Sequence, residues 1–272
     1  MDAERLLHCV AMPPRIRIED RGSVRVLTID NEAKRNALDF RALDELGDAC
    51  AAAGRDRVRC LLLRGAGEEA FSSGFDLAEL DLLSPLGERP DEAVERAAEA
   101  LEAVPCPTVA YLNGGAFGGG FELAATCDLR VAREDVLLGM PPAKLGVVYP
   151  EGGLGRFLAL VGAARTRELF FAGRPVRADV ALAWGLVNRL VQAEGAEAAA
   201  LALAEEIANN APLAVQGMKR ILRLLEASRV RGLADAERDE IAGLRSRAFE
   251  SADIREGRRA FQERRPPRFA GR

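Results

Sequence analysis

The chain has 272 residues, a net charge of −4 at pH 7, and apolar and charged fractions of 49% and 29%, which are typical of a globular protein. Its one histidine, His8, excludes three-histidine zinc sites and two-histidine iron sites within a single chain. That histidine also falls in an expected N-terminal tail, which argues against a Ser-His-Asp triad. Acid–base chemistry must therefore use carboxylates, backbone groups, water or one of the two tyrosines, Tyr111 and Tyr149.

Charge and cysteine content narrow the partners and the compartment. The chain is acidic overall, which argues against a nucleic-acid partner, although residues 255–272 hold seven arginines and two acids. This basic stretch is either a solvated helix end or a contact for an anionic ligand. The five cysteines have no CxxC spacing, and the sequence shows neither a signal-peptide pattern nor an apolar run long enough for a membrane span. We therefore expect reduced thiols, a cytoplasmic location, no membrane partner and no metal site.

The first two thirds of the chain alternate predicted strands with predicted helices. After a tail over residues 1–14, apolar and polar residues alternate on both sides of residues 21–23, which predicts a β-hairpin. The elements that follow are a helix over 38–53, with Asp39 as its N-cap and Gly54 as its stop, a strand over 58–63, a polar stretch over 65–76, a helix over 91–103, a strand over 108–112, a helix over 121–126, and strands over 128–132 and 136–138. This order predicts a largely parallel sheet covered by helices.

The last third of the chain is almost wholly helical. After Pro150 only residues 186–191 depart from the helical pattern. We therefore expect three parts: the N-terminal tail over 1–14, an α/β core domain over 15–205, and a helical region over 206–272 that serves as a cap or an oligomerisation layer.

Two glycine-rich segments are similar to nucleotide-binding motifs but lack what those motifs need. Residues 65–70 match GxGxxA after a predicted strand, yet residues 71–74 do not favour the helix that should follow. The run over 114–120 lacks the lysine and hydroxyl residue of a P-loop. At the start of a helix, glycines 118–120 instead offer free backbone N–H groups that suit an oxyanion, although the run is equally consistent with a tight strand-to-helix turn.

A second polar loop, over 70–77, follows the preceding strand, and loops that leave the carboxyl ends of parallel strands gather on one edge. Two such loops could each donate one N–H to a shared carbonyl oxygen, which is what an oxyanion hole requires. Together, Ala-Phe-Ser-Ser-Gly-Phe-Asp-Leu over 70–77 and Asn-Gly-Gly-Ala-Phe-Gly-Gly-Gly-Phe-Glu-Leu-Ala over 113–124 resemble the crotonase (enoyl-CoA hydratase/isomerase) superfamily. The resemblance covers about residues 15–270 and includes Asn-Ala-Leu over 36–38, Trp-Gly-Leu-Val over 184–187 and the segment over 256–261.

This resemblance implies a fold, an assembly and a substrate. The fold is the crotonase (ClpP-like) α/β fold, with ββα repeats, a largely parallel sheet and a helical C-terminal region, usually assembled as a homotrimer or a dimer of trimers. The substrate is an acyl-CoA thioester, with no additional cofactor, and its thioester oxygen is held by the backbone N–H groups of Phe75 and Gly119. The positions that contact CoA in such enzymes hold Lys34, Arg35, Ser73, Asp76, Leu77 and Arg264.

The hydratases of this superfamily use a pair of glutamates that position and activate water. Which reaction we expect therefore depends on whether this sequence holds both glutamates. The first matches Glu122, which is either catalytic or a structural helix carboxylate. The second should follow a Phe-Gly-x-Pro pattern, but here the segment over 138–142 reads Leu-Gly-Met-Pro-Pro. Because proline cannot transfer a proton, Pro142 argues against a hydratase that uses two glutamates.

Two replacements follow Pro142. The sequence Leu-Gly-Val-Val-Tyr over 145–149 resembles that of the methylmalonyl-CoA decarboxylase-like members, in which a tyrosine occupies this place in the active site. Loss of CO₂ from a malonyl-type thioester needs a desolvated carboxylate and a stabilised enolate, and the Tyr149 phenol could orient the one and protonate the other. Alternatively, Pro-Glu-Gly over 150–152 resembles some Δ3,Δ2-enoyl-CoA isomerases, in which the glutamate shuttles a proton if burial raises its pKa.

We therefore favour decarboxylation of a small malonyl-CoA-type thioester through Tyr149. The alternative is an enoyl-CoA isomerase or hydratase of fatty-acid metabolism that uses Glu151 or Glu122, and a third hypothesis is a non-catalytic acyl-CoA binder. Tyr149 has the alternative role of a packed aromatic residue, and Glu151 that of a cap for a helix that begins near Gly153.

Overall fold

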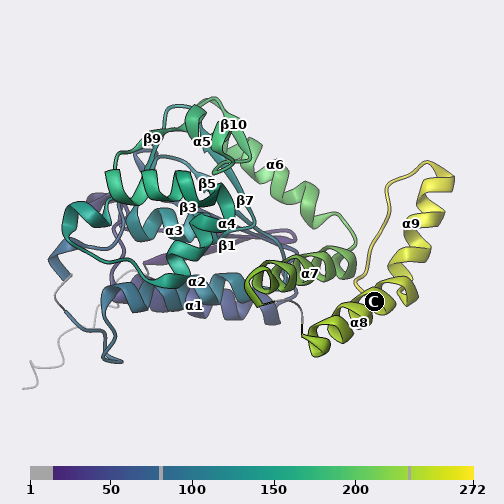
Figure 1. Cartoon of the computed structure of the whole chain (residues 1–272). Helices are drawn as coiled ribbons and strands as arrows, with labels where there is room; N and C mark the ends of the chain where they lie inside the picture. Colours follow the sequence, from purple (N-terminus) through teal and green to yellow (C-terminus); the bar gives the residue numbers. More distant parts are fainter. Residues whose placement is uncertain (1–14, 80–81, 232–233) are drawn as a thin grey trace, which may run out of the picture.

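The computed structural model describes residues 15–79, 82–231 and 234–272, so the predicted tail over 1–14, with His8, lies outside the described residues. A six-stranded sheet forms the centre of the molecule (Figure 1). Its strands, in spatial order, are β1 (Ile16–Arg21), β2 (Val24–Ile29), β3 (Cys60–Gly65), β5 (Thr108–Leu112), β7 (Leu129–Arg133) and β10 (Arg189–Val191). The strands β1 and β2 form the predicted hairpin, and every other neighbouring pair is parallel, which confirms the largely parallel sheet.

A smaller sheet lies at the carboxyl ends of the large one. It contains β4 (Ala70–Ser72), β6 (Gly115–Phe117), β8 (Leu137–Gly139) and β9 (Val176–Arg177), and only β9 runs antiparallel to its neighbour. Each of three successive units places one strand in the large sheet, the next strand in the small sheet, and then a helix: β3, β4 and α2 (Pro90–Ala103); β5, β6 and α3 (Gly118–Thr126); β7, β8 and α4 (Glu151–Arg167). The expected ββα repeats are therefore confirmed.

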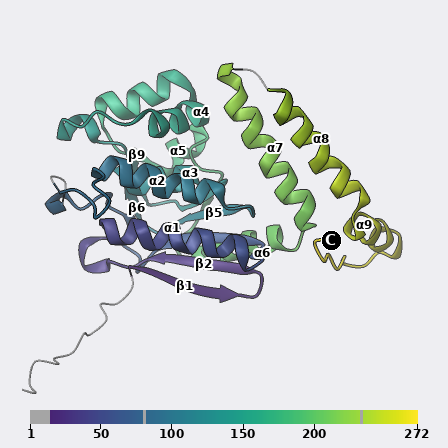
Figure 2. The same cartoon turned by 90° about the horizontal axis from the view of Figure 1, so that it is seen from below.

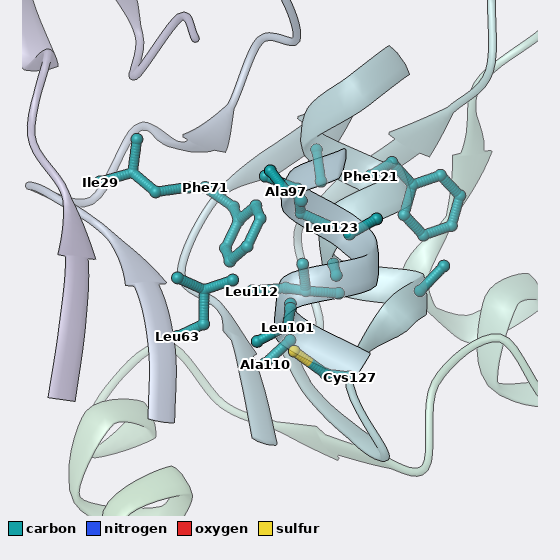
Figure 3. Close-up of a cluster of buried hydrophobic side chains, with 14 of the residues drawn as sticks. Ile29, Leu63, Phe71, Ala97, Leu101, Ala110, Leu112, Phe121, Leu123 and Cys127 are labelled. Atoms are coloured by element: carbon teal, nitrogen blue, oxygen red, sulfur yellow. The ribbon is translucent and has the colours of Figure 1, made fainter. Parts of the chain in front are cut away.

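Helices cover both faces of the large sheet, which explains why its central strands β3 and β5 are almost continuously apolar rather than alternating. Leu61 and Leu63 of β3 point toward α1 (Phe40–Arg55), α2 and α3, whereas Cys60 and Leu62 point toward α6 (Ala196–Ala208). Figure 3 shows part of the first cluster, in which side chains of β2, β3, β4 and β5 meet those of α2 and α3. Helix α3 is thus held between the strands and α2, and its position is set by close packing on several sides.

Local boundaries differ from the predictions in three places. Asp39 caps α1 as predicted, accepting a hydrogen bond of 2.7 Å from the Ala42 N–H, but the helix continues through Gly54 because that glycine does not adopt the left-handed conformation that ends helices. The strands β4 and β6 lie inside segments predicted as loops, since each has three residues and is stabilised mainly by its neighbours in the sheet. Helix α3 begins at Gly118 rather than Phe121.

The remaining described elements complete the chain order. Short helices connect the strands: η2 (Glu32–Lys34), η3 (Leu77–Glu79), η4 (Pro142–Leu145), η5 (Glu168–Ala172) and α5 (Ala178–Trp184). The C-terminal helices are α7 (Pro212–Arg231), α8 (Asp235–Glu250) and α9 (Ala252–Glu263). Helices α7 and α8 lie side by side at one end of the molecule (Figure 2). None of the helices in the described part of the chain combines the length and hydrophobicity that a membrane span requires.

A buried lysine attaches α7 to the amino-terminal edge of the sheet. The Lys219 ammonium donates hydrogen bonds to the Asp128 carboxylate at 2.7 Å and to the Cys106 carbonyl oxygen at 2.9 Å. Asp128 precedes β7 and Cys106 precedes β5, so the Lys219 ammonium binds residues just before the start of two central strands. Farther along the chain, the Phe269 carbonyl oxygen accepts a hydrogen bond of 2.9 Å from Arg59, just before β3, so the C-terminal segment returns to the same edge.

We predict that Lys219→Ala lowers the free energy of unfolding by about 2 kcal/mol, because it leaves the partly buried Asp128 carboxylate without its cation. Chemical denaturation followed by circular dichroism measures this change. Lys144→Ala, which removes an exposed lysine, is the matched control and should change the unfolding free energy by less than about 0.5 kcal/mol. Equal effects of the two substitutions would show that the Lys219 contact does not hold α7 in place.

Candidate active site

The loop after β4 and the first turn of α3 make direct backbone contact. A Cβ atom on Gly74 would lie 2.8 Å from the Phe117 carbonyl oxygen, so only glycine permits this approach. Gly74 and Gly118 also have φ angles of +94° and +50°, which glycine adopts without strain. Phe75 and Gly119 each follow one of these glycines, and the contact therefore brings their two peptide groups to the same region.

Neither the Phe75 N–H nor the Gly119 N–H donates a hydrogen bond within the strand bridge or helix that contains it. The Leu38 N–H donates to the Gly74 carbonyl oxygen at 2.8 Å, and the Leu38 carbonyl oxygen accepts from the Asp76 N–H at 2.7 Å. These two bonds form the parallel bridge between Leu38 and Phe75, which therefore does not use the Phe75 N–H. The Gly119 N–H is among the first four of α3, which have no acceptor within the helix, and no side chain of the N-cap residue binds there. The site thus holds two backbone donors of the kind that bind an oxyanion.

Two buried asparagines fix the turn that carries the chain from the large sheet to the small one. The Asn113 side chain accepts from the Gly65 N–H at 2.9 Å and donates to the Gly67 carbonyl oxygen at 2.8 Å. The Asn36 side chain donates to the Ala70 carbonyl oxygen at 2.7 Å. The GxGxxA segment over 65–70 is therefore a strand-to-strand turn and does not open the helix that a dinucleotide-binding loop needs.

Glu122 lies one helical turn after Gly119 on α3 and is almost completely buried, with 1% of its side chain exposed. One carboxylate oxygen accepts a hydrogen bond of 2.9 Å from Arg156, and the other accepts a hydrogen bond from the Tyr149 hydroxyl. Burial raises the pKa of Glu122 to about 7, although Tyr149 and Arg156 oppose the rise. Burial and the neighbouring Glu122 carboxyl also raise the pKa of Tyr149 well above its ordinary value, so this phenol stays protonated and remains a donor.

Arg156 connects Glu122 to two further carboxylates that sequence reasoning missed. Its guanidinium also contacts Glu95 at 2.8 Å and Glu102 at 2.8 Å, both on α2. On the far side of this cluster, Arg223 of α7 contacts Glu102 at 3.3 Å. The sequence carries one weak signal for this role, since Arg156 stands directly before Phe157 in the predominantly apolar first half of α4.

Two glycines in the first turn of α4 make room for the Glu122–Tyr149 pair and for Glu95. A Cβ atom on Gly153 would lie 2.5 Å from the Tyr149 ring and 2.8 Å from a Glu122 carboxylate oxygen. A Cβ atom on Gly152 would lie 2.2 Å from the Glu95 carboxylate. The Gly-Gly sequence therefore lets the helix approach a cluster of acidic side chains that larger residues would push away.

The structure does not bury Glu151. Helix α4 begins at this residue, rather than near Gly153, and its side chain is exposed in the single chain. The single chain therefore does not enclose this carboxylate as a proton-shuttle role would require, and Pro150 rather than Glu151 occupies the N-cap position. Pro142, at the position where the resemblance predicts a second glutamate, is buried at the start of η4.

Five of the six residues predicted to contact CoA lie together beside the loop after β4. The Lys34 ammonium contacts the Asp76 carboxylate at 2.5 Å, and the Ser73 hydroxyl donates to the Lys34 carbonyl oxygen at 3.2 Å. The Ser73 N–H donates to the Arg35 carbonyl oxygen at 3.0 Å, and the neighbouring Leu77 is 60% exposed. These residues form an exposed, partly basic surface next to the two backbone donors.

Arg264 is separated from these five residues within one chain. It directly follows α9, and the segment after it is bound to Arg59 at the amino-terminal edge of the sheet. Lys34 and Arg35 follow β2 at the opposite, carboxyl-terminal edge, and both views show α9 away from that edge (Figures 1 and 2). Within one chain Arg264 therefore lies apart from the other five residues, because the C-terminal helices extend away from the core.

The described cysteines are free, buried thiols. Burial raises the pKa of Cys50 to about 12 and that of Cys106 to about 11, which keeps both protonated near neutral pH. These thiols are therefore poor nucleophiles. Within residues 15–79, 82–231 and 234–272, no three histidine, cysteine, aspartate or glutamate side chains are grouped so that they could hold a metal ion.

Comparisons with known proteins show the family to which the chain belongs. The family described as enoyl-CoA hydratase/isomerase matches residues 19–272. A methylmalonyl-CoA decarboxylase from Escherichia coli (strain K12) is 33% identical over 253 residues, covering 91% of this chain and 95% of its own. A carnitinyl-CoA dehydratase from Proteus mirabilis (strain HI4320) is 34% identical over 266 residues, covering 96% and 100%. The solved structure of an enoyl-CoA hydratase/carnithine racemase from Magnetospirillum magneticum is 31% identical, covers 96% of this chain and 97% of its own, and has a TM-score of 0.88.

We predict that Gly153→Ala lowers the free energy of unfolding by about 1–3 kcal/mol, because the new methyl group overlaps Tyr149 and Glu122. The matched control is Gly155→Ala, two residues along the same helix, where a Cβ atom meets nothing within 4 Å. Alanine favours helices over glycine, so the control should leave stability unchanged or raise it by up to about 1 kcal/mol. Thermal and urea denaturation of both variants measure the difference, and a Gly153→Ala protein as stable as the control would contradict the close packing.

Proposed function

Because this chain belongs to the enoyl-CoA hydratase/isomerase (crotonase) family of acyl-CoA enzymes, we propose that it decarboxylates a small malonyl-CoA-type thioester. The observation that carries this proposal is the hydrogen bond from the Tyr149 hydroxyl to the buried Glu122 carboxyl. Pro142 stands where a hydratase needs its second glutamate, and Glu151 is exposed, so Tyr149 and Glu122 are the pair left to move a proton. The name of the Escherichia coli relative supports the same reaction.

In this proposal the backbone donors hold the thioester oxygen. The N–H groups of Phe75 and Gly119 bind the developing enolate oxygen, where the positive end of the α3 dipole adds to its stabilisation. Breaking the bond between the α-carbon and the carboxylate releases CO₂ and leaves its electron pair in the enolate. No base is needed for this step, since the carboxylate leaves without giving up a proton.

The second step returns a proton to the α-carbon. The Tyr149 hydroxyl donates its proton to the enolate carbon, and the phenol oxygen takes a proton from neutral Glu122, to which it is hydrogen-bonded. Glu122 regains a proton from solvent after product leaves. The net change is one proton consumed and CO₂ released for each thioester converted to the shorter acyl-CoA.

The CoA portion has a partner surface in Lys34, Arg35, Ser73, Asp76 and Leu77. Lys34 and Arg35 supply positive charge for phosphate groups, and the exposed Leu77 offers an apolar contact. Both cations lie next to the loop that carries Phe75, so a bound CoA would extend from the enolate site along this surface.

We predict that the protein converts methylmalonyl-CoA or ethylmalonyl-CoA to CO₂ and the shorter acyl-CoA. Tyr149→Phe should lower kcat about 100-fold or more, because it removes the proton donor while keeping the ring. Tyr111→Phe is the matched control, since Tyr111 is buried in the cluster beneath α6, and it should leave kcat unchanged. Trapped labelled CO₂ and chromatography of the acyl-CoA products measure the reaction.

Other outcomes distinguish the remaining reactions of the family. Failure of the wild-type protein to act on either malonyl-type thioester would overturn the decarboxylase proposal. Conversion of 2-enoyl- or 3-enoyl-CoA that is abolished by Glu122→Gln would then identify a hydratase or isomerase that uses this single glutamate. Loss of that activity in Glu151→Gln instead would assign the shuttle to Glu151.

We also propose that residues 206–272 form an oligomerisation region of a homotrimer or a dimer of trimers, built on the core domain over 15–205. Met218 and Leu222 are 57% and 59% exposed and lie four residues apart on one face of α7, whereas Lys219 of the same helix binds the core. A neighbouring copy that covers this face would remove the two apolar side chains from water. Such an assembly would also give Arg264 a route to the CoA bound by another copy.

Light scattering of the purified protein should then give three or six times the chain mass of 29.3 kDa. Leu222→Glu should shift the population to smaller species, because it places a charge in an apolar interface. Asp48→Lys, at an exposed position of α1 outside residues 206–272, is the control and should leave the mass unchanged. A monomeric wild-type protein at micromolar concentration would contradict this part of the proposal.

A further inference from the structure

We infer that Arg156 sets the protonation state of Glu122 by dividing one guanidinium between that carboxylate and two others. This inference rests on the proposed function, in which neutral Glu122 reloads Tyr149 with a proton. The geometry is specific: Arg156 contacts Glu122 at 2.9 Å, Glu95 at 2.8 Å and Glu102 at 2.8 Å. Arg156 is thus a positioning residue, since it acts on the donor pair through Glu122.

The charges of the cluster do not balance when every carboxyl group is ionised. The groups that face Glu122 come from four elements besides its own: Glu95 and Glu102 on α2, Tyr149 before α4, Arg156 on α4 and, through Glu102, Arg223 on α7. Three carboxylates against two guanidiniums leave one negative charge in excess. A partly buried cluster relieves that excess most readily by binding one proton.

Burial decides which carboxyl group binds the proton. The Glu95 and Glu102 side chains are 22% and 33% exposed, so water stabilises their charges. Glu122 is 1% exposed and shares Arg156 with both of them, so its anion is the least stabilised of the three. The direction of its raised pKa, whose largest cause is burial and to which the negative charge of Glu95 contributes, agrees with this ranking.

The proton on Glu122 has a consequence for Tyr149. Ionised Glu122 accepts the hydrogen bond of the Tyr149 hydroxyl but carries no proton that it could transfer. Neutral Glu122 can replace the proton that Tyr149 transfers to the enolate. Because the pKa of Glu122 is raised, the neutral form is populated below a pH of about 7 and is lost above it. Burial and the negative charge of Glu95 therefore keep Glu122 neutral near pH 7, and the shared positive charge of Arg156 limits how far its pKa rises.

The scarcity of tyrosine makes this protonation state directly measurable. The chain has two tyrosines, so a Tyr111→Phe background labelled with ¹³Cζ-tyrosine gives a single NMR reporter, Tyr149, hydrogen-bonded to Glu122. The Tyr149 phenol itself does not ionise in the range used, from about pH 5 to about pH 9, because its own pKa is raised well above its ordinary value. The midpoint of its chemical-shift titration therefore reports the pKa of Glu122.

We predict opposite shifts for two substitutions. Arg156→Met should raise the midpoint by at least about one pH unit, because it removes the cation that stabilises the Glu122 anion. Glu95→Gln should lower the midpoint, because it removes a neighbouring negative charge and leaves Arg156 to bind Glu122 more fully. Arg156→Lys, which keeps the charge but cannot reach three carboxylates at once, should give a smaller rise than Arg156→Met.

Arg167→Met, at an exposed position of the same helix, is the control and should leave the midpoint unchanged. Midpoints that do not move, or that move in the same direction in Arg156→Met and Glu95→Gln, would overturn the inference, since loss of packing alone has no reason to give opposite signs. If Arg156→Met fails to fold, Glu95→Gln and Arg156→Lys still decide the question. Opposite shifts without turnover of any malonyl-type thioester would instead overturn the proposed function and leave the role of Arg156 standing.

Discussion

The backbone contact between the loop after β4 and the first turn of α3 is the constraint on which the rest of the site depends. It exists because Gly74 has no Cβ atom to meet the Phe117 carbonyl oxygen, and because Gly120 lets α3 rest directly on Ser72. The same contact orients α3, so that Glu122 emerges one turn later toward Tyr149 and Arg156. A change that separated the two loops would therefore displace the backbone donors and the proton-bearing side chains together.

The acidic cluster is a second constraint, and it works through charge rather than shape. Buried carboxyl groups are costly unless they are paired or neutral, and here one guanidinium serves the buried Glu122 and two partly buried glutamates. The result is a carboxyl group with a raised pKa beside a protonated phenol, within a family whose members are acyl-CoA enzymes. Gly152 and Gly153 permit this arrangement, because a Cβ atom on either glycine would overlap the side chains of the cluster.

Most of the fold could be predicted from the sequence, because the signals that specify its strands and helices are local. Continuous apolar runs marked β3 and β5, and Asp39 marked the start of α1, since strand burial and helix capping depend on neighbouring residues. Sequence reasoning missed β4 and β6 as strands, because three-residue strands are stabilised by partners far along the chain. It also treated Tyr149 and Glu122 as rival catalysts, whereas they are hydrogen-bonded to each other.

The sequence by itself determined the family, the parallel α/β architecture and the two glycine-rich loops, because residue type and spacing are enough to specify turns, strands and helix starts. Only the tertiary structure decided that Glu122 is buried, that Glu151 is exposed, and that the end of α9, with Arg264, lies apart from Lys34 within one chain. It alone also brought Arg156 to Glu95 and Glu102. Burial and charge pairing depend on which distant segments pack together, and no local pattern in the chain encodes that packing.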